Sequence, residues 1–224
     1  MHNPKQIKRS SPAEAPTKYA VIGDLVQSRK GKREQTQAAL MDGLEKVTTP
    51  SIEVFHPTVG DEIQGIFASL GNAFQALHFL RVQMRILNTD IRFGIGIGEI
   101  KEIAQAPSIQ DGSAWWNARS AIETVHEMQG TPGRAGVRTG IIGFEENGFE
   151  TITATLVSAS AQLIDSQISS LKPSTCGSLL GLLIGEPNYV TAEKLSISAP
   201  ANSQRVNTNN LRPLADAMRA LWEL

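Results

Sequence analysis

The spacing of apolar residues predicts alternating strands and helices in the first two thirds of the chain. Residues 19–22 form a short, continuous apolar run that is typical of a buried strand. Residues 34–47 have apolar positions at a helical period, and Pro50 ends that helix. Residues 52–59 alternate between apolar and polar, and residues 63–70 follow them. We therefore expect a β-hairpin with its turn at Gly60-Asp61-Glu62.

The next strand, residues 91–100, carries Gly94, Gly96 and Gly98 at alternate positions. Alternate residues of a strand share one face, so this face allows another element to pack close to the backbone. Amphipathic helices are predicted before and after it, at 71–87 and 111–128. The order strand, helix, hairpin, helix, strand, helix indicates an α+β fold with one mainly antiparallel sheet and helices on one face.

The last third of the chain has a different pattern. Residues 137–144 and 150–155 suggest a closing hairpin around Asn147-Gly148. Beyond that point short helices are predicted without strand signals, at 156–171, 174–184, 189–195, 199–206 and 212–224. We therefore expect a polar, disordered tail at 1–17, an α+β domain at 18–155 and a small all-α domain at 156–224.

Composition narrows the class of protein. The chain has 224 residues, 41% of them hydrophobic, and a net charge of −1, which gives no general attraction to nucleic acids or acidic membranes. The single cysteine, Cys176, excludes a disulfide within this sequence and favours a reducing compartment. No apolar run approaches the roughly 20 residues of a membrane span. These features predict a cytoplasmic protein with no membrane partner.

Acidic residues stand where two predicted strands end. Asp24 closes the first strand, and Asp61 and Glu62 lie at the hairpin tip. If the first strand lies beside the hairpin, these carboxylates meet, and carboxylate oxygens are ligands that Mg²⁺ prefers. We therefore expect Asp24, Asp61 and Glu62 to bind Mg²⁺. Acids also end strands and occupy turns without binding a metal, and that alternative stays open.

The loop after Asp24 is polar and basic, with Ser28, Arg29 and Lys30, and it leads into a helix N-terminus. Backbone N–H groups and the helix dipole favour phosphate at such a place. Ser28, Arg29 and Lys30 are therefore expected to bind the phosphates of a nucleotide.

Four segments together resemble the SatD family of bacterial proteins over residues 18–128: 23–24 (GD), 58–65 (TVGDEIQG), 91–99 (IRFGIGIGE) and 111–119 (DGSAWWNAR). SatD-like proteins in turn look like remote relatives of class III nucleotide cyclases and GGDEF diguanylate cyclases. The resemblance implies a cyclase-like or palm-like (ferredoxin-like) domain in which Asp24 and Asp61 or Glu62 bind metal. It also implies that Asn117 and Arg119, on a later helix, bind the nucleotide.

Two departures from the cyclase pattern bear on catalysis. Class III cyclases carry a base-selecting lysine shortly before the hairpin acid, where this chain has Pro57 and Thr58. They also use an asparagine and an arginine four residues apart, whereas Asn117 and Arg119 are two apart and do not share a helix face. The pattern favours nucleotide binding, or an altered reaction, over a standard cyclase.

Residues 188–206 resemble a bacterial helix-turn-helix. Ala192 is the small residue expected where two helices cross, and Ser198 is a good N-cap for the second helix. Ser203, Gln204 and Arg205 on that helix are side-chain types that contact bases or phosphates in the major groove of DNA.

The segment also departs from that motif. Ser196 stands where the turn glycine is usual, and Asn202 stands at a normally apolar position. From residue 160 onward five Lys and Arg balance five Asp and Glu, whereas DNA-binding modules usually have a basic face. A helical bundle that packs or dimerises without DNA is the alternative. A homodimer is expected in either case, and in a DNA-binding protein it would multiply weak half-site contacts.

These patterns lead to three hypotheses on function. The first is a DNA-binding transcriptional regulator whose α+β domain senses a nucleotide with Mg²⁺. The second is a nucleotidyl-transfer or cyclase-type enzyme with Asp24, Asp61 and Glu62 as metal ligands. The third is a structural partner protein that binds neither ligand. Whether the protein is an enzyme is left open by the sequence.

Overall fold

The computed structural model describes residues 16–26, 33–51, 53–58, 60–105 and 108–224. The strands are β1 Lys18–Leu25, β2 Glu53–Pro57, β3 Glu62–Phe67, β4 Ile91–Gly98, β5 Lys101–Gln105, β6 Ser108–Asp111 and β7 Thr139–Ile142. The helices are α1 Arg33–Glu45, α2 Leu70–Ile86, α3 Ser113–Gln129, α4 Thr151–Ser170, α5 Pro173–Leu183, α6 Asn188–Lys194, α7 Ala199–Thr208 and α8 Leu211–Trp222, with a short 3₁₀ helix at Glu145–Asn147.

The main sheet has the strand order β2-β3-β1-β4-β7, with β1 at its centre. The predicted hairpin of β2 and β3 is confirmed, and β1 pairs antiparallel with both β3 and β4. The edge strand β7 pairs parallel with β4, so the sheet is mixed. A second, two-stranded sheet joins β5 to β6 and was not predicted.

The predicted closing hairpin at 137–155 is wrong. After β7 the chain makes a 3₁₀ turn, reverses at Gly148 with φ 80°, and enters α4 at Thr151. Val157, Ala161, Ile164 and Ile168 are buried at helical spacing. A helix buries all of this apolar stripe on one side, whereas a strand would divide it between two faces. The stripe therefore favours the helical conformation.

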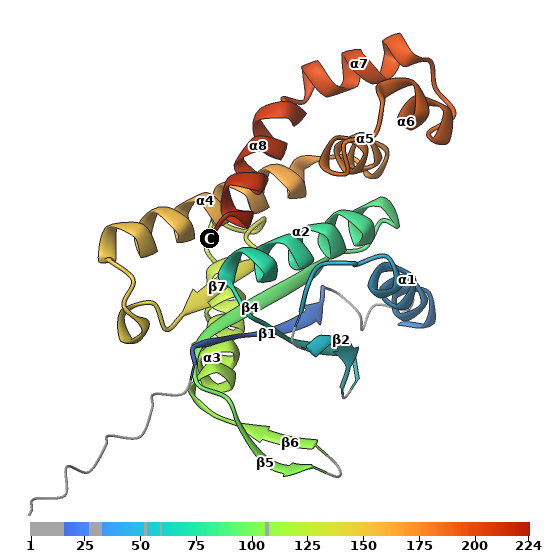
Figure 1. Cartoon of the computed structure of the whole chain (residues 1–224). Coiled ribbons are helices and arrows are strands. Elements are labelled where there is room, and N and C mark those ends of the chain that lie inside the picture. The colour runs from blue at the N-terminus through green and yellow to red at the C-terminus, as the bar shows by residue number, and fades with distance from the viewer. Residues whose placement is uncertain (1–15, 27–32, 52, 59, 106–107) are drawn as a thin grey trace, which may run out of the picture.

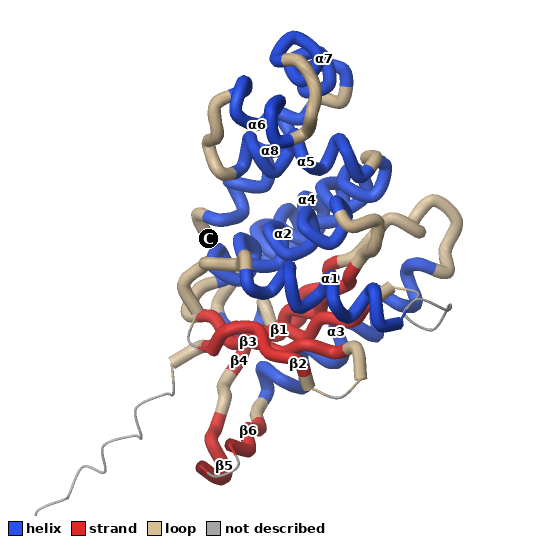
Figure 2. The backbone as a smooth tube through the Cα atoms, turned by 90° about the vertical axis from the view of Figure 1, so that its right-hand side faces the viewer, coloured by secondary structure: helices blue, strands red, loops and turns tan. Residues whose placement is uncertain are grey.

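Helices cover both faces of the sheet, so the expectation of helices on one face is also wrong. Figure 2 shows α1 and α2 above the sheet and α3 below it. Strand β4 explains the difference, because Gly94 and Gly96 face α3 while Phe93 and Ile95 belong to the core on the α2 side. A Cβ atom at position 96 would lie 1.9 Å from the carbonyl oxygen of Ala114, so glycine is what lets α3 approach.

Of the helices that follow α4, α5 and α8 pack on the side of α2 that faces away from the sheet, and α6 and α7 pack against α5 (Figure 1). A single hydrophobic cluster runs from Val21 in β1 to Leu221 in α8. Near the end of α8, the indole Nε1 of Trp222 donates a hydrogen bond to His78 Nδ1 on α2, at 2.9 Å. The predicted boundary between 155 and 156 falls inside α4.

A buried polar junction also ties α4 to the rest of the fold. Arg81 of α2 donates to Asp90, at the start of β4, and to Asp165 of α4. The backbone N–H groups of Arg138 and Thr139 donate to Asp165 Oδ2 at 2.8 and 2.7 Å. Buried charges persist only when they are paired and hydrogen-bonded in this way, so the junction fixes α4 against α2 and β7.

Candidate functional site

The end of β1 brings Asp24 beside the hairpin. Asp24 lies directly opposite Glu62 of β3 and Arg92 of β4. Residues directly opposite each other in an antiparallel pair point to the same face, here the face covered by α3. Asp24 Oδ2 is 3.4 Å from Arg92 Nε and 3.4 Å from Nε2 of His126 on α3. The first strand and the hairpin are therefore neighbours, as predicted.

The electrostatic surroundings of Asp24 set it apart from an ordinary surface acid. Burial raises the pKa of its carboxyl above the usual value, and the nearby Asp61 raises it further, against the lowering effect of Arg92 and His126. Asp24 and Asp61 are thus close enough to repel each other. A cation between two such carboxylates would relieve the repulsion.

Glu62 has a different environment, because it is held by Arg119 of α3. The guanidinium donates two hydrogen bonds to the carboxylate, at 2.6 and 2.9 Å. Gln64 Nε2 donates to the same carboxylate at 3.1 Å. Burial raises the pKa of Glu62, but the hydrogen bonds from Arg119, Gln64 and Thr58 outweigh it and hold the pKa below its ordinary value. Glu62 is therefore a paired, ionised acid.

A pocket of about 700 Å³ opens beside this pair on the α3 face. Its walls include Ile22 and Gln64 from the sheet, Gln110 from β6, and Trp115 and Arg119 from α3. The buried indole Nε1 of Trp115 has no hydrogen-bond partner among the residues that the structure describes, whereas that of the exposed Trp116 donates to Asp111 at 2.8 Å. The pocket thus combines aromatic faces with polar groups, the usual mixture of a small-molecule site.

The structure brings together four of the predicted ligand residues. Asp24, Asp61, Glu62 and Arg119 converge at one end of the sheet. Asn117 does not join them, because its amide donates to the carbonyl oxygen of Ile97 at 2.9 Å. The predicted phosphate-binding residues Ser28, Arg29 and Lys30 lie outside the described residues.

The donor set fits Mg²⁺ only in part. Within the described ranges, no three His, Cys, Asp or Glu residues are grouped as a metal site. Asp24 lies near Asp61 but also faces the guanidinium of Arg92, and Glu62 faces that of Arg119. Proteins usually hold Mg²⁺ through one or two carboxylates together with phosphate oxygens and water. The two aspartates therefore suit Mg²⁺ that arrives with a phosphate-bearing ligand, not an ion held by the protein alone.

Several residues that line the pocket were not among the site residues predicted from the sequence. Gln64 stands two residues after Glu62 and so shares its strand face, a signal that period-two spacing provides. Glu53 and His56 of β2 line the same pocket, and Gln110 Nε2 donates to Glu53 Oε2 at 2.9 Å. No signal pointed to Gln110, because the β5–β6 hairpin itself was not predicted.

The helical end forms two short helices, α6 and α7, joined by a tight turn. Ser196 in the turn has φ 54°, the left-handed conformation that favours glycine. Ser198 caps α7 as predicted, with its Oγ accepting from the N–H of Ala201 at 3.3 Å. Asn202 is buried and satisfied: its Oδ1 accepts from Ser178 Oγ at 2.6 Å, and its Nδ2 donates to Asn188 Oδ1 at 2.9 Å.

The predicted DNA-contacting residues differ in exposure. Gln204 is exposed, Ser203 is half-buried, and Arg205 donates to the carbonyl oxygen of Ser174 at 2.9 Å. Asn207 and Thr208 are exposed at i+3 and i+4 from Gln204, so these three residues share the outer face of α7. Asn207 and Thr208 were not among the predicted residues, although their helical spacing from Gln204 places them on the same face.

Comparison with known proteins gives one match, at the family level. The model of the SatD family matches residues 18–216. The chain belongs to the SatD family. The SatD match covers both the α+β part and most of the helical part, well beyond residues 18–128. Neither the curated proteins nor the solved structures contain a match. None of the helices in the described ranges has the length and apolar character that a membrane span requires.

Proposed function

We propose that this SatD-family protein binds a nucleotide together with Mg²⁺ on the α3 face and acts as a DNA-binding transcriptional regulator. One observation carries the proposal: Asp24, Asp61 and the Glu62–Arg119 pair meet at the end of the sheet beside a pocket of about 700 Å³. Paired carboxylates, a guanidinium and aromatic side chains are what a Mg²⁺-bound nucleotide needs for phosphate and base contacts.

Each group has a distinct role in this proposal. Asp24 and Asp61 would hold Mg²⁺, which would supply the positive charge that draws phosphate oxygens to two carboxylates. Arg119 is about half exposed and presents its guanidinium to the pocket, where it can pair with a phosphate in the planar, two-point manner that suits arginine. Trp115 and Trp116 offer ring surface to a base.

The geometry favours sensing over turnover. Asn117 and Arg119 would be the pair that supports a transition state in a cyclase, yet Asn117 is bonded to Ile97 and Arg119 to Glu62. The two side chains therefore do not point to one place where a reacting group could be held. We therefore place binding ahead of cyclase or nucleotidyl-transfer activity, and turnover of a nucleotide by the purified protein would reverse that order.

The α6–turn–α7 unit supports the DNA-binding half of the proposal. Its outer face carries Gln204 and Asn207, and amide side chains of this type read adenine in the major groove. The buried side of α7 carries Asn202, whose hydrogen bonds to Ser178 and Asn188 fix this helix against α5 and α6. The exposed residues of α7 would therefore meet DNA on a rigid unit.

A homodimer is proposed from the surface of α4. Ile152, Leu156 and Leu163 are 71%, 62% and 73% exposed, and with the exposed Ala159 they follow the 4-3-4 spacing of a coiled-coil seam. The helix has one charged residue, Asp165, and it is buried. An uncharged apolar seam fits a second copy of itself, because no like charges would meet across the two-fold axis.

A thermal-shift panel tests the nucleotide half. Each nucleoside mono-, di- and triphosphate is added with and without Mg²⁺, because a ligand that binds only the native state raises the melting temperature. We expect at least one nucleotide to raise it only with Mg²⁺, and Asp61→Asn to abolish the rise. A flat panel removes the nucleotide proposal.

A gel shift on DNA from the protein's own promoter region tests the DNA half. We expect a shift that changes with nucleotide and is lost in a Gln204→Ala/Asn207→Ala double variant. Absence of a shift with and without nucleotide removes the DNA half and leaves the ligand site to be judged separately.

A further inference from the structure

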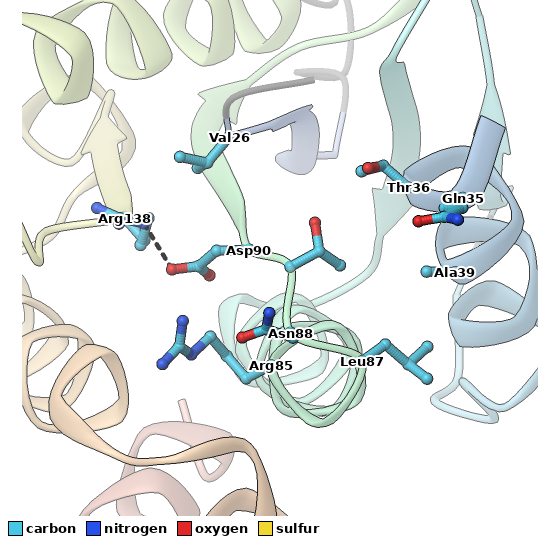
Figure 3. A pocket seen from close by; sticks show the side chains of 10 residues that line it. Val26, Gln35, Thr36, Ala39, Arg85, Leu87, Asn88, Asp90 and Arg138 are labelled. Carbon is cyan, nitrogen blue, oxygen red and sulfur yellow. Dashed lines mark hydrogen bonds and ion pairs between the residues drawn. The ribbon is translucent and has the colours of Figure 1, made fainter. Parts of the chain in front are cut away.

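A second cavity, of about 350 Å³, lies on the α2 side of the sheet, the face opposite the proposed nucleotide pocket (Figure 3). Figure 3 shows Gln35, Thr36 and Ala39 of α1 on one side and Arg85, Asp90 and Arg138 on the other. The turn between α2 and β4 completes the wall. Most of the lining side chains are polar, so the cavity is not a packing defect of the apolar core.

The charges around this cavity are not balanced. The Asp90 carboxylate is shared by two arginines, with Arg81 Nε at 3.1 Å and Arg138 Nε at 2.9 Å. Burial raises the pKa of Asp90, but Arg81 and Arg138 outweigh it and keep the pKa below its ordinary value. Asp90 is therefore ionised and already neutralised.

Arg85 supplies the positive charge that remains. Its Nη2 donates to the carbonyl oxygens of Ser169 and Leu171, at 3.3 and 2.8 Å. Among the described residues it forms no ion pair with a carboxylate. Its partners among the described residues are two carbonyl oxygens and the neutral thiol of Cys176, so none of them is an anion. A guanidinium that lines a polar cavity with such partners is a site for an anion from outside.

We propose that this cavity binds a small oxyanion, the phosphate or carboxylate group of a metabolite smaller than a nucleotide. Arg85 would bind the charged group, Arg138 would add a hydrogen bond to it, and Gln35 and Asn88 would hydrogen-bond the remainder. The volume lies at the lower end of the range for small-molecule pockets, which suits a ligand of this size.

The cavity lies next to the junction between the sheet and α4, so a bound ligand would affect that junction. Arg85 binds the carbonyl groups at the end of α4, and the N–H of Arg138 binds Asp165 within α4. A ligand on these two arginines would therefore strengthen the junction between the sheet and the helices that lead to α6 and α7. The oxyanion would act as an effector of the helical part, separate from the nucleotide.

The test is a titration of the full chain with inorganic phosphate and, in a second arm, with succinate. The melting temperature is measured at each concentration, and potassium chloride keeps the ionic strength constant. We expect a saturable rise with at least one of them, and the arm that responds identifies phosphate or carboxylate as the ligand group. No saturable rise with either probe overturns the proposal.

Variants decide whether the response comes from this cavity. Arg85→Met removes the unpaired cation and is expected to weaken binding at least about tenfold, since charged hydrogen bonds of this kind are lost. Arg212→Met removes an equal charge from an exposed position on α8 and is the matched control, expected to bind as wild type. Equal loss in both variants would mean general charge attraction and would overturn the proposal.

Because Arg85 also holds the end of α4, its variant can lose stability for structural reasons. Ala39→Leu, on the opposite wall, fills the cavity without touching the charges and is expected to abolish the rise. Arg119→Gln, in the nucleotide pocket, is expected to leave it intact. Wild-type affinity in Ala39→Leu, or loss in Arg119→Gln, would overturn the assignment to this cavity.

Discussion

The Glu62 carboxylate is held ionised by its neighbours, chiefly Arg119 and Gln64. Arg119 was predicted as a ligand residue from the sequence, but its pairing with Glu62 was not. That pairing depends on how β3 lies against α3, and the two residues are far apart in the chain. The family resemblance therefore implied that Arg119 is a ligand residue, and the fold was needed to show that it meets Glu62.

The pairing predicts a pH-dependent contribution to stability. Because the pKa of Glu62 lies below its ordinary value of 4.5, the ionised form stabilises the fold above that pH, and the contribution is lost as the pH falls through the folded-state pKa. Glu62→Gln should cost up to about 1 kcal/mol at pH 7, and the difference from wild type should shrink below pH 4.5. Urea unfolding across pH measures it, with the exposed Glu127→Gln as control. A difference that does not change with pH would contradict this account.

Gly96 makes a second prediction about a single residue. A Cβ there would lie 1.9 Å from Ala114 O and 2.2 Å from Ala118 N, so α3 would have to move. Gly96→Ala should therefore destabilise the protein by about 3 kcal/mol, at the upper end of overpacking costs. Gly130→Ala is the control, because its φ of −73° suits any residue and the nearest atom is 3.3 Å away. Similar urea midpoints for the two variants would mean that the glycine face is not what seats α3.

Helices and strands were predicted unequally well from the sequence. The helical periods located α2 and all five helices from α4 to α8, because a buried stripe repeats over several turns. The β5–β6 hairpin was missed, since its strands are short. Around residues 137–155 the Asn147-Gly148 turn signal indicated a hairpin, but the buried face of α4 prevailed over it. Local turn chemistry is a weak guide where a longer apolar pattern begins nearby.

The contact between α2 and α8 predicts a pH effect of its own. Burial, with a further contribution from Arg81, lowers the pKa of His78 from 6.5 to about 3. The unfolded chain binds a proton there while the folded chain does not, so stability is present above pH 6.5 and is lost as the pH falls toward 3. The loss should be about 1.4 kcal/mol for each pH unit within that window.

His78→Asn removes the titrating group while its side-chain oxygen can still accept from Trp222 Nε1, so its unfolding free energy should fall less between pH 6 and pH 4. Trp222→Phe, which keeps the buried imidazole, should be less stable but retain the wild-type pH slope. Chemical denaturation at a series of pH values makes the comparison. An unchanged slope in His78→Asn would show that this imidazole is not responsible.

At the scale of the whole molecule, helices lie on both faces of a mixed sheet, and one hydrophobic cluster extends from the sheet into the helical part. The sequence indicated two domains, because the pattern changes from strands to helices near residue 156. The core cluster and the Arg81–Asp165 pair cross that boundary, and neither can be recognised from periodicity, since each joins residues from distant segments. The sequence predicted only that residues 71–87 form an amphipathic helix, whereas α2 packs against both the sheet and the helical part.

The seam on α4 predicts the oligomeric state. Leu156→Arg would place two like charges across the proposed two-fold axis, so the variant should be monomeric at concentrations where wild type is a dimer. Gln37→Arg, at an exposed position on α1, is the matched control and should remain a dimer. Light scattering after size-exclusion chromatography gives the masses. Monomeric wild type, or a dimer in Leu156→Arg, would contradict the assignment of this surface.

The central claim is that Asp24, Asp61 and Arg119 form one Mg²⁺–nucleotide site, and calorimetric titration of the nucleotide tests it most directly. In the presence of Mg²⁺ we predict one nucleotide bound per chain. We predict an affinity at least about tenfold lower when Mg²⁺ is removed, when Asp61 is changed to Asn, or when Arg119 is changed to Gln. Binding that is unaffected by all three changes, or no heat from any nucleotide, would contradict the account.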